Sequence, residues 1–438
     1  MASWQLRPPT RLPAADVTVL GGGCAGVMAA VSAARRGARV TLVEREGTLG
    51  GTSTGVLDTF YGFWTPGEAP RRVVAGLPGE VVDRLTARGH AFLRPNSYGA
   101  GNGVTYNPEV LRCLYDQLCH EAGVRVLLHT SLTSVALDGN RPAELLLTSG
   151  SELLELPTSV AVDCSGDAVL AHLAGCASEG FSDIPNAQVM TTTFTMAPVD
   201  QAAFAAVGRD GLLARLEQAL VSGEYDLPRR EGSTHVTTVP GVEFVHMTRV
   251  ADLDPRDPSA LSEAERLGRL QAFEYGRFLV DQVPGFADAR PTWMSRRIGI
   301  RESRRVRGQY WLERDDVVSG RRFDDAIAQG AAPIEEHSHG DDTRWEFLGG
   351  TYDIPLRSLV PVDVDGLLVA GRCFSASHDA HASARNMAQC MAMGQAAGTA
   401  AALATNAGGA VAALDATAVQ RALVDDGALL DLATAAAP

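Results

Sequence analysis

The sequence has few features of secreted, zinc-binding or membrane proteins. Its seven cysteines are an odd number, are scattered and include no C-x-x-C pair, which argues against a disulfide framework, a zinc site and a dithiol redox pair. No uninterrupted apolar run reaches the roughly 18 residues of a membrane span, and residues 1–11 lack the basic and apolar regions of a secretion signal. We therefore expect a cytoplasmic protein without a structural metal.

Positive charge is also scarce, because 38 Lys and Arg face 52 Asp and Glu and the formal net charge is −14. Nucleic acids and anionic membranes are polyanions, so this balance argues against both as partners. The 438 residues, 45% of them hydrophobic and 21% charged, describe an ordinary globular chain that is too long for one core. We expect a small-molecule substrate and leave a homo-oligomer possible.

The most informative stretch lies near the N-terminus. The apolar run Val17–Leu20 is followed by Gly21, Gly23 and Gly26 at G-x-G-x-x-G spacing, an Ala-rich helix, a second apolar run and Glu44. A strand that turns sharply into a helix aims backbone N–H groups and the helix dipole at a pyrophosphate. In such a unit the glycines allow the turn, the approach of phosphate and close packing, and the acid can bond ribose hydroxyls. The stretch predicts a dinucleotide-binding βαβ unit.

Further glycine-rich and small-residue segments follow. The loop Gly50–Thr54 allows another close backbone approach and offers hydroxyl groups. The apolar strand Val160–Asp163 ends in a small-residue turn, and Leu367–Gly371 is a third such strand. The helix expected over 387–404 is rich in small residues, so it can lie close to another backbone or a flat ring, and its N-terminus suits a group that gains negative charge.

The composition changes between residues 181 and 329. Leu261–Gln282 predicts a strongly amphipathic helix with Ser262 as N-cap. We interpret this region as a substrate or cap domain. The predicted division is residues 1–180 for the first part of a dinucleotide-binding domain, 181–345 for the cap with a return segment, and 346–438 for the C-terminal part of the dinucleotide-binding domain.

Two polar clusters stand out in the later half of the chain. Residues 296–307 carry six arginines, which we interpret mainly as a solvated face, although one or two can present a bidentate fork to a substrate carboxylate. His337 and His339 lie in an acidic polar loop, which favours a solvated surface over a metal site because further ligands would be needed.

These motifs together resemble the bacterial FAD-dependent oxidoreductases of glutathione-reductase-like fold and, more distantly, the succinate dehydrogenase and fumarate reductase flavoproteins. The segments that carry the resemblance are GGGCAG with Glu44, GGTST, AVDCSGD, IGIRESRRVRGQYWLERDDV, and YDIPLRSLVP through LLVAGRCFSASHDAHASARNMAQCMAMGQAAGTAAAL. The resemblance implies an α/β fold, with a Rossmann-type FAD-binding domain and an inserted α+β cap. It also implies noncovalent FAD, since the GGTST loop holds no histidine, cysteine or tyrosine.

The motifs and the resemblance imply a common set of FAD-binding residues. They lie in the glycine turn, at the end of the second strand, in the GGTST loop, past the strand of residues 124–129, after two later strands and at the N-terminus of the small-residue helix. The set is Gly21, Gly23, Cys24, Ala25, Gly26, Glu44, Arg45, Gly50, Gly51, Thr52, Ser53, Leu132, Ser165, Gly166, Gly371, Arg372, Arg385, Asn386 and Met387.

The resemblance favours an enzyme that oxidises or reduces a small organic molecule by hydride transfer at flavin N5. Since no second G-x-G-x-x-G follows a strand, we expect no NAD(P)H domain, and electrons would pass to O2, a carrier or a second substrate. A proton moves with the hydride, and our candidates for handling it are His378, His381, Tyr352 and Arg301. Two alternatives stay open, a monooxygenase using transient NAD(P)H and O2, and a structural flavoprotein without turnover.

Overall fold

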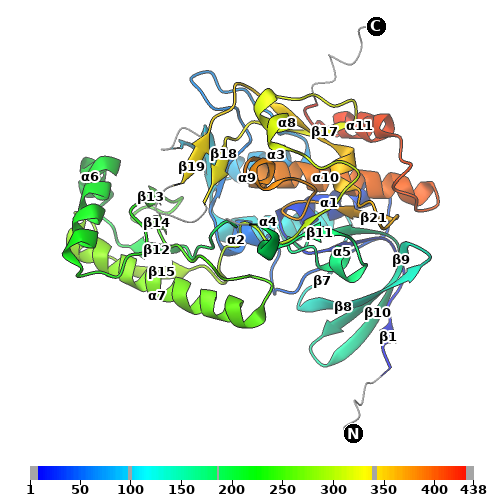
Figure 1. Ribbon diagram of the computed structural model, residues 1–438, viewed down its shortest axis with the longest axis horizontal. Coiled ribbons are helices and arrows are strands. Elements are labelled where there is room, and N and C mark those ends of the chain that lie inside the picture. Colours follow the sequence, from blue (N-terminus) through cyan, green and yellow to red (C-terminus); the bar gives the residue numbers. More distant parts are fainter. Residues whose placement is uncertain (1–7, 97–100, 185–186, 338–342, 431–438) are drawn as a thin grey trace.

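A computed structural model describes residues 8–96, 101–184, 187–337 and 343–430 (Figure 1). Its centre is a parallel sheet in which β7, β3, β2, β10 and β21 lie side by side in that order. These strands are rich in Val, Leu and Ala because helices and loops cover both faces of a parallel sheet. Their bounds are Arg125–Leu127, Val40–Val43, Ala15–Leu20, Glu152–Asp163 and Leu367–Val369.

The long strand β10 joins this sheet to an antiparallel meander. Its first half pairs with β9, Arg141–Ser149, which pairs in turn with β8, Thr130–Asp138. Its second half pairs in parallel with both β2 and β21. The short β1, Thr10–Arg11, also lies beside β10. The α/β fold with a parallel sheet, predicted from the strand, glycine and helix order, is therefore confirmed.

Two helices from opposite ends of the chain pack against each other over the sheet. They are α1, Cys24–Arg35, and α10, Met387–Asn406, which lie side by side in Figure 1. A Cβ on Gly394 or Gly398 would overlap the backbone of α1 at Ala25 and Ala29. The prediction that the small residues of α10 allow close approach to another backbone is confirmed, and the partner is α1.

Further helices contact this pair, namely α3 at Leu77–Ala87, α4 at Pro108–Glu121 and α11 at Ala416–Asp425. The short α5, Val169–Leu173, packs against β8 and β10. The side chain of Asn107 caps α4 by accepting from the N–H groups of Glu109 and Val110, as its position before Pro108 predicts. None of the described helices combines the length and apolar character that crossing a bilayer requires.

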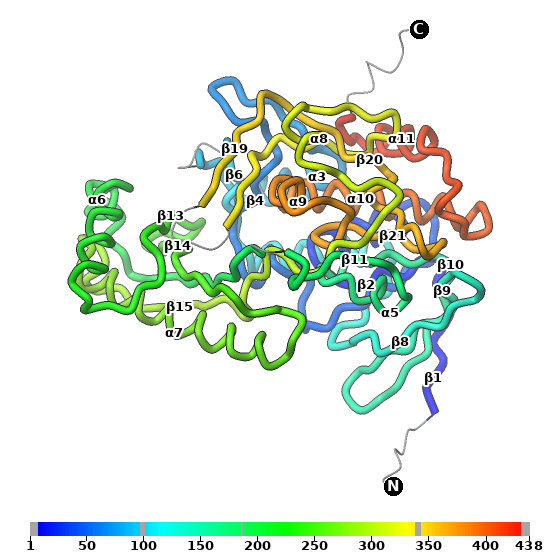
Figure 2. The backbone as a smooth tube through the Cα atoms, viewed as in Figure 1, coloured from blue at the N-terminus to red at the C-terminus, as the bar shows by residue number. Residues whose placement is uncertain are grey.

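The cap is a separate antiparallel sheet on one side of the molecule, green in Figures 1 and 2. Its order is β13-β14-β12-β15, and α6 and α7 flank it. The bounds are Ser233–Val236, Glu243–His246, Phe194–Ala197, Arg290–Met294, Gln201–Ser222 and Pro258–Gln282. The amphipathic helix α7 begins earlier than predicted, because Asp257 caps it ahead of Pro258, and Ser262 lies within its first turns.

Shorter elements complete the chain. These are α2 (Thr52–Gly55), β4 (Thr59–Phe60), β5 (Ala91–Pro95), β6 (Asn102–Tyr106), β11 (Ser178–Glu179), β16 (Arg305–Val306), α8 (Arg314–Ser319), β17 (Ala326–Gly330), β18 (Ile334–Glu336), β19 (Arg344–Glu346), β20 (Tyr352–Pro355) and α9 (His378–Ala384).

The division of the chain at residues 180 and 345 stays a prediction. The described cap residues between Met190 and Ile298 form hydrophobic clusters of their own. In contrast, Ile327 and Ile334 belong to the same core as α1 and α10. In addition, β17 pairs with β20 across the predicted boundary at 345. This packing favours a cap that ends near residue 300.

Candidate functional site

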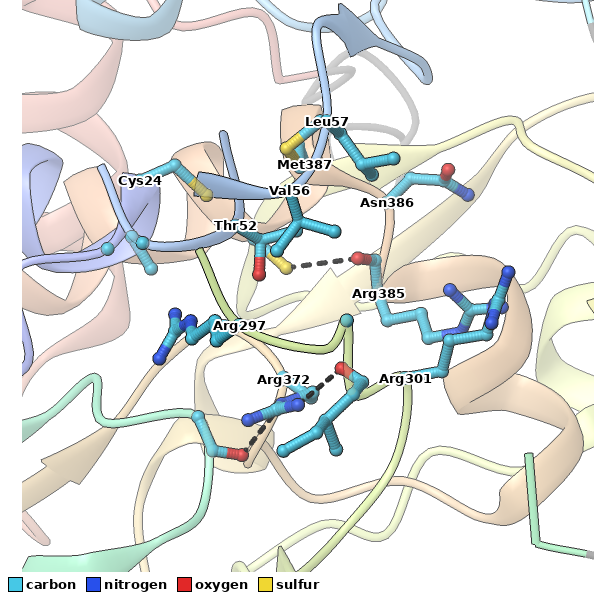
Figure 3. A pocket seen from close by; sticks show the side chains of 18 of the residues that line it. Cys24, Thr52, Val56, Leu57, Arg297, Arg301, Arg372, Arg385, Asn386 and Met387 are labelled. Carbon is cyan, nitrogen blue, oxygen red and sulfur yellow. Dashed lines mark hydrogen bonds between the residues drawn. The ribbon is translucent and has the colours of Figure 1, made fainter. Parts of the chain in front are cut away.

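A cavity of about 460 Å³ lies between the carboxyl ends of the parallel strands and the cap sheet (Figure 3). Such a volume is in the range of small-molecule sites. Most of the predicted FAD-binding residues line it, and these are Gly21, Gly23, Cys24, Ala25, Glu44, Arg45, Gly51, Thr52, Leu132, Ser165, Gly166, Gly371, Arg372, Arg385, Asn386 and Met387.

The glycine turn at the end of β2 has the geometry that its spacing predicts. Gly21 has a φ of 94°, and a Cβ there would lie 2.6 Å from the carbonyl oxygen of Cys164. A Cβ on Gly26 would overlap the carbonyl oxygen of Gly21, so this glycine allows α1 to start against the turn. A Cβ on Gly23 would meet no atom within 4 Å, although this residue lines the cavity. Gly23 therefore leaves open space at the N-terminus of α1.

The acid after β3 supports this turn. Glu44 is 6% exposed, and its carboxylate accepts from the backbone N–H of Gly22 at 2.6 Å and of Glu46 at 2.8 Å. Each carboxylate oxygen has a second lone pair, so the predicted bond to a ribose hydroxyl is still available.

The second glycine loop lies against the first. The N–H of Gly50 donates to the carbonyl of Gly22 at 2.7 Å, and Gly51 brings Thr52 to the cavity wall. Ser53 is fully buried and donates to the carbonyl of Gly50. Gly26, Gly50 and Ser53 are outside the cavity lining, so their positions indicate support for the loops and not direct contact with a ligand.

Arginines surround this end of the cavity. Arg372 forms an ion pair with Asp167 at 2.7 Å and donates to the carbonyl of Gly166 at 3.0 Å. Arg297 was not singled out from the sequence, yet its Nη2 would lie 3.3 Å from a Cβ on Gly51, beside Gly23. Burial, together with Arg45 and Arg372, lowers the pKa of Arg297.

These features fit the diphosphate of a dinucleotide. The N-terminus of α1 has no side-chain cap, so its first N–H groups are directed at the open space that Gly23 leaves. Arg297 adds positive charge beside that space. The residues that would hold FAD are therefore present, with Leu132 and Ser165 farther along the same lining.

The other end of the cavity is a polar chamber, which we define by Arg301, Arg385, His246, Glu335 and His337. An Nη2–H of Arg301 donates to Nε2 of His246 at 3.1 Å, and an Nη1–H donates to the carbonyl of Val189 at 2.7 Å. Burial and the neighbouring Arg301 hold the pKa of His246 well below its ordinary value. His246 is therefore a neutral acceptor.

On the facing side of the chamber, Glu335 and His337 are 2.8 Å apart. Burial would raise the pKa of Glu335, but His337, Arg385 and Arg301 lower it to about 2. Burial and Arg301 lower the pKa of His337. The geometry fits a neutral ring whose Nε2–H donates to the Glu335 carboxylate and whose Nδ1 accepts from Thr343 at 3.1 Å.

The sequence matches one family over most of its length. A family model described as FAD dependent oxidoreductase aligns with residues 16–423. The chain belongs to the FAD-dependent oxidoreductase family. It is therefore a flavin enzyme with FAD as its cofactor. A search of curated proteins gave no significant match.

Solved structures with similarity to this flavoenzyme are distant in sequence. A geranylgeranyl bacteriochlorophyll reductase-like protein from Thermoplasma acidophilum is 13% identical, with 96% of this chain and 85% of the other covered and a TM-score of 0.46. The flavin-dependent brominase Bmp2 is 14% identical, with 94% and 83% covered and a TM-score of 0.47. The p-nitrophenol 4-monooxygenase PnpA from Pseudomonas putida DLL-E4 is 12% identical, with 95% and 84% covered and a TM-score of 0.45.

Of the four predicted acid–base residues of the flavoenzyme, only Arg301 lines the cavity. Tyr352 is fully buried, and its hydroxyl bonds that of Ser383 at 2.8 Å. His378 and His381 lie just before the small-residue helix α10, as expected, on a short helix of their own, α9. Nothing in this geometry favours proton transfer by Tyr352 or by the two histidines.

Both histidines of α9 have partners within the fold. His378 Nδ1 is 2.8 Å from a carboxylate oxygen of the buried Glu302. Burial lowers the pKa of His378, but the hydrogen bond to Glu302 and its negative charge raise that pKa above its ordinary value. His381 is fully buried, and its Nε2–H donates to the carbonyl of Arg372 at 2.8 Å. Burial lowers the pKa of His381 to about 3, so its ring is neutral.

His381→Ala should therefore destabilise the flavoenzyme without slowing flavin reduction. Replacing the buried ring leaves a cavity and an unpaired carbonyl, which should cost about 2–5 kcal/mol. Urea unfolding followed by circular dichroism measures the loss, with His120→Ala as the control because His120 is exposed on α4. If flavin-loaded His381→Ala is reduced about 100-fold more slowly than the parent, the structural role is wrong and the predicted catalytic role is supported.

Two interpretations of polar segments are corrected. His337 is 5% exposed and lines the cavity, because Ile334–Glu336 forms strand β18 and carries the following histidine inward. His339 lies outside the described residues. Among residues 296–307 only Arg296 is an exposed arginine, so the segment is not a solvated face, and Arg297 and Arg301 both line the cavity.

The structure also reveals a histidine–carboxylate pair that the sequence analysis missed. His235 of β13 and Asp58, which follows α2, both line the cavity, and Nε2 lies 2.8 Å from a carboxylate oxygen. The His235 ring stacks on Phe244 with centroids 5.1 Å apart. Asp58 and His235 are 177 residues apart in sequence, so no local spacing could have joined them.

Proposed function

We propose that this FAD-dependent oxidoreductase exchanges a hydride with a small organic substrate held in the polar chamber. The observation that supports the proposal is that one cavity includes both the glycine turn and the chamber, so cofactor and substrate can share one space. When bound, FAD supplies the two-electron chemistry by exchanging the hydride at N5. The protein supplies orientation and a group for the accompanying proton.

We propose His235 for that proton. A carboxylate only accepts hydrogen bonds, so Asp58 fixes the tautomer in which Nε2–H donates and Nδ1 keeps a lone pair. When the substrate is oxidised, its C–H bond would give up a hydride, which bound FAD would take up, and the O–H or N–H proton would pass to Nδ1 of His235. The C–O or C–N bond becomes double, and in the reverse direction His235 returns the proton.

The N-terminus of α10 supports the flavin end of the proposal. Arg385, Asn386 and Met387 line the cavity where this helix begins, and Asn386 gives the helix no side-chain cap. The N–H of Ala388 donates to the carbonyl of Tyr61. The positive dipole of the helix N-terminus favours negative charge, and the reduced flavin ring gains such charge at N1 and the C2 carbonyl. Noncovalent attachment and an acceptor that is O2 or a carrier belong to the same proposal.

Anaerobic screening of the purified holoprotein tests this function. Alcohols, amines and hydroxy acids are added in turn, and bleaching of the flavin absorbance followed by recovery with O2 is the expected result for one class. Bleaching that requires NADH or NADPH would favour the monooxygenase alternative. If no donor bleaches a flavin that dithionite reduces readily, the hydride-transfer proposal is wrong and a structural role for FAD is favoured.

A further inference from the structure

We propose that Arg301 and Arg385 bind a carboxylate group of the substrate, which makes the substrate of this flavoenzyme an organic acid. The inference rests on the proposed function, because it assigns a substrate class to the same chamber. It begins from the charge of the cavity. Among the described lining residues, the acids Glu44, Asp58 and Glu335 face a larger set of arginines, namely Arg45, Arg94, Arg297, Arg301, Arg372 and Arg385. The cavity is thus positive in a chain with a net charge of −14.

Part of this charge belongs to the cofactor end. Arg372 is paired with Asp167, and Arg45 lies 4.0 Å from the same carboxylate. Arg297 lies beside the glycine turn, where the two phosphates of FAD are expected. In the view of Figure 3, Arg297 is on the opposite side from Arg301 and Arg385, which extend toward the same region. The arginines of the chamber therefore need another anion.

Arg301 and Arg385 have only neutral hydrogen-bond acceptors among the described residues. Those of Arg301 are His246 and a backbone carbonyl. Arg385 donates to Gln188 Oε1 at 2.8 Å and to the backbone carbonyl of Glu335 at 3.2 Å. Its buried Nε has no hydrogen-bond acceptor in the described part of the chain. Both guanidinium groups lie in the cavity wall at intermediate exposure without a directly hydrogen-bonded anion from the described chain, so this arrangement favours binding of an anion.

The chamber's charge matches a monoanion. Two arginines and the Glu335 carboxylate leave one positive charge, because His246 and His337 are neutral. Guanidinium forks bind planar carboxylates in a bidentate manner, which a spherical halide cannot reproduce. Burial and Arg385 lower the pKa of Arg301, the direction expected for two adjacent cations that the single carboxylate of Glu335 does not neutralise. The geometry and the charge balance together favour a carboxylate.

Calorimetric titration of the holoprotein with benzoate tests the inference, with benzamide as a neutral probe of the same shape. We expect saturable benzoate binding that also shifts the flavin absorbance, and benzamide binding at least about tenfold weaker, since benzamide carries no negative charge and has one acceptor oxygen in place of two. Arg301→Gln should weaken benzoate binding by at least the same factor while FAD stays bound. Arg296→Gln is the matched control, because Arg296 is exposed and lies in the same segment outside the cavity.

Several results would overturn the carboxylate site. These are equal binding of benzoate and benzamide, bromide displacing benzoate at equal concentration, and unchanged benzoate affinity in flavin-loaded Arg301→Gln. Arg385→Gln that loses FAD but still binds benzoate would remove Arg385 from the site and assign it to the flavin. Because binding is measured without turnover, failure here is distinct from failure of the donor screen, which would reject hydride transfer itself.

Discussion

A Gly23→Val variant of this flavoenzyme is expected to purify without bound FAD. The parent position opens onto the cavity, with no atom within 4 Å of a Cβ placed there, and it precedes the uncapped N-terminus of α1. A branched apolar side chain would fill the phosphate space and separate the diphosphate from the helix N–H groups. Losing charged hydrogen bonds of about 3 kcal/mol in total corresponds to roughly 100-fold weaker binding. Flavin absorbance relative to protein measures the loss.

The same experiment needs a variant with equal added bulk outside the site. Gly349→Val serves, because Gly349 is exposed and a Cβ there also meets no atom within 4 Å. This control should keep a full complement of FAD. Circular dichroism should show both variants folded, since the side chain added in Gly23→Val would enter open space. Stoichiometric FAD in Gly23→Val would mean that the phosphates bind elsewhere.

Replacing His235 by Gln should slow reduction of the flavin by about 10²–10⁴-fold, the range of general acid–base catalysis. The variant keeps a polar side chain between Asp58 and Phe244, so FAD content and folding should be preserved. Stopped-flow reduction by the donor found in the anaerobic screen measures the rate. Asp58→Asn should give a smaller loss, because the ring keeps its lone pair but its tautomer is no longer fixed.

Two controls separate proton transfer from a structural effect. Dithionite should reduce His235→Gln and the parent at equal rates, because this route requires no proton removal from substrate. Added imidazole should restore part of the rate to His235→Ala, whose missing ring leaves room for it. His120→Gln, at an exposed position on α4, should react like the parent. Equal substrate-driven rates in flavin-loaded His235→Gln and the parent would exclude His235 as the acid–base group.

Local sequence patterns were sufficient to predict the parts of the protein that are built from consecutive residues. The order of Val17–Leu20, the glycines and Glu44 predicted a βαβ unit, because strand, turn and helix preferences act over a few residues. Asn107 before Pro108 predicted the start of α4 for the same reason. Where two residues could serve as the helix N-cap, the predicted start of the helix was less accurate, since Asp257 with its following proline starts α7 ahead of Ser262.

The polar side chains of the cavity meet through contacts that no spacing in the sequence records. His235 meets Asp58 and Arg301 meets His246 only because the cap sheet packs over the carboxyl ends of the parallel strands. The polarity of a segment also did not predict its exposure, because His337 and Arg301 lie in polar segments and yet line the cavity. Burial of a charge is determined by its partners across the fold. The sequence alone therefore determined the glycine turn and its acid, which lie within one local βαβ unit, whereas tertiary packing decided which distant polar side chains line the cavity, Arg297 among them.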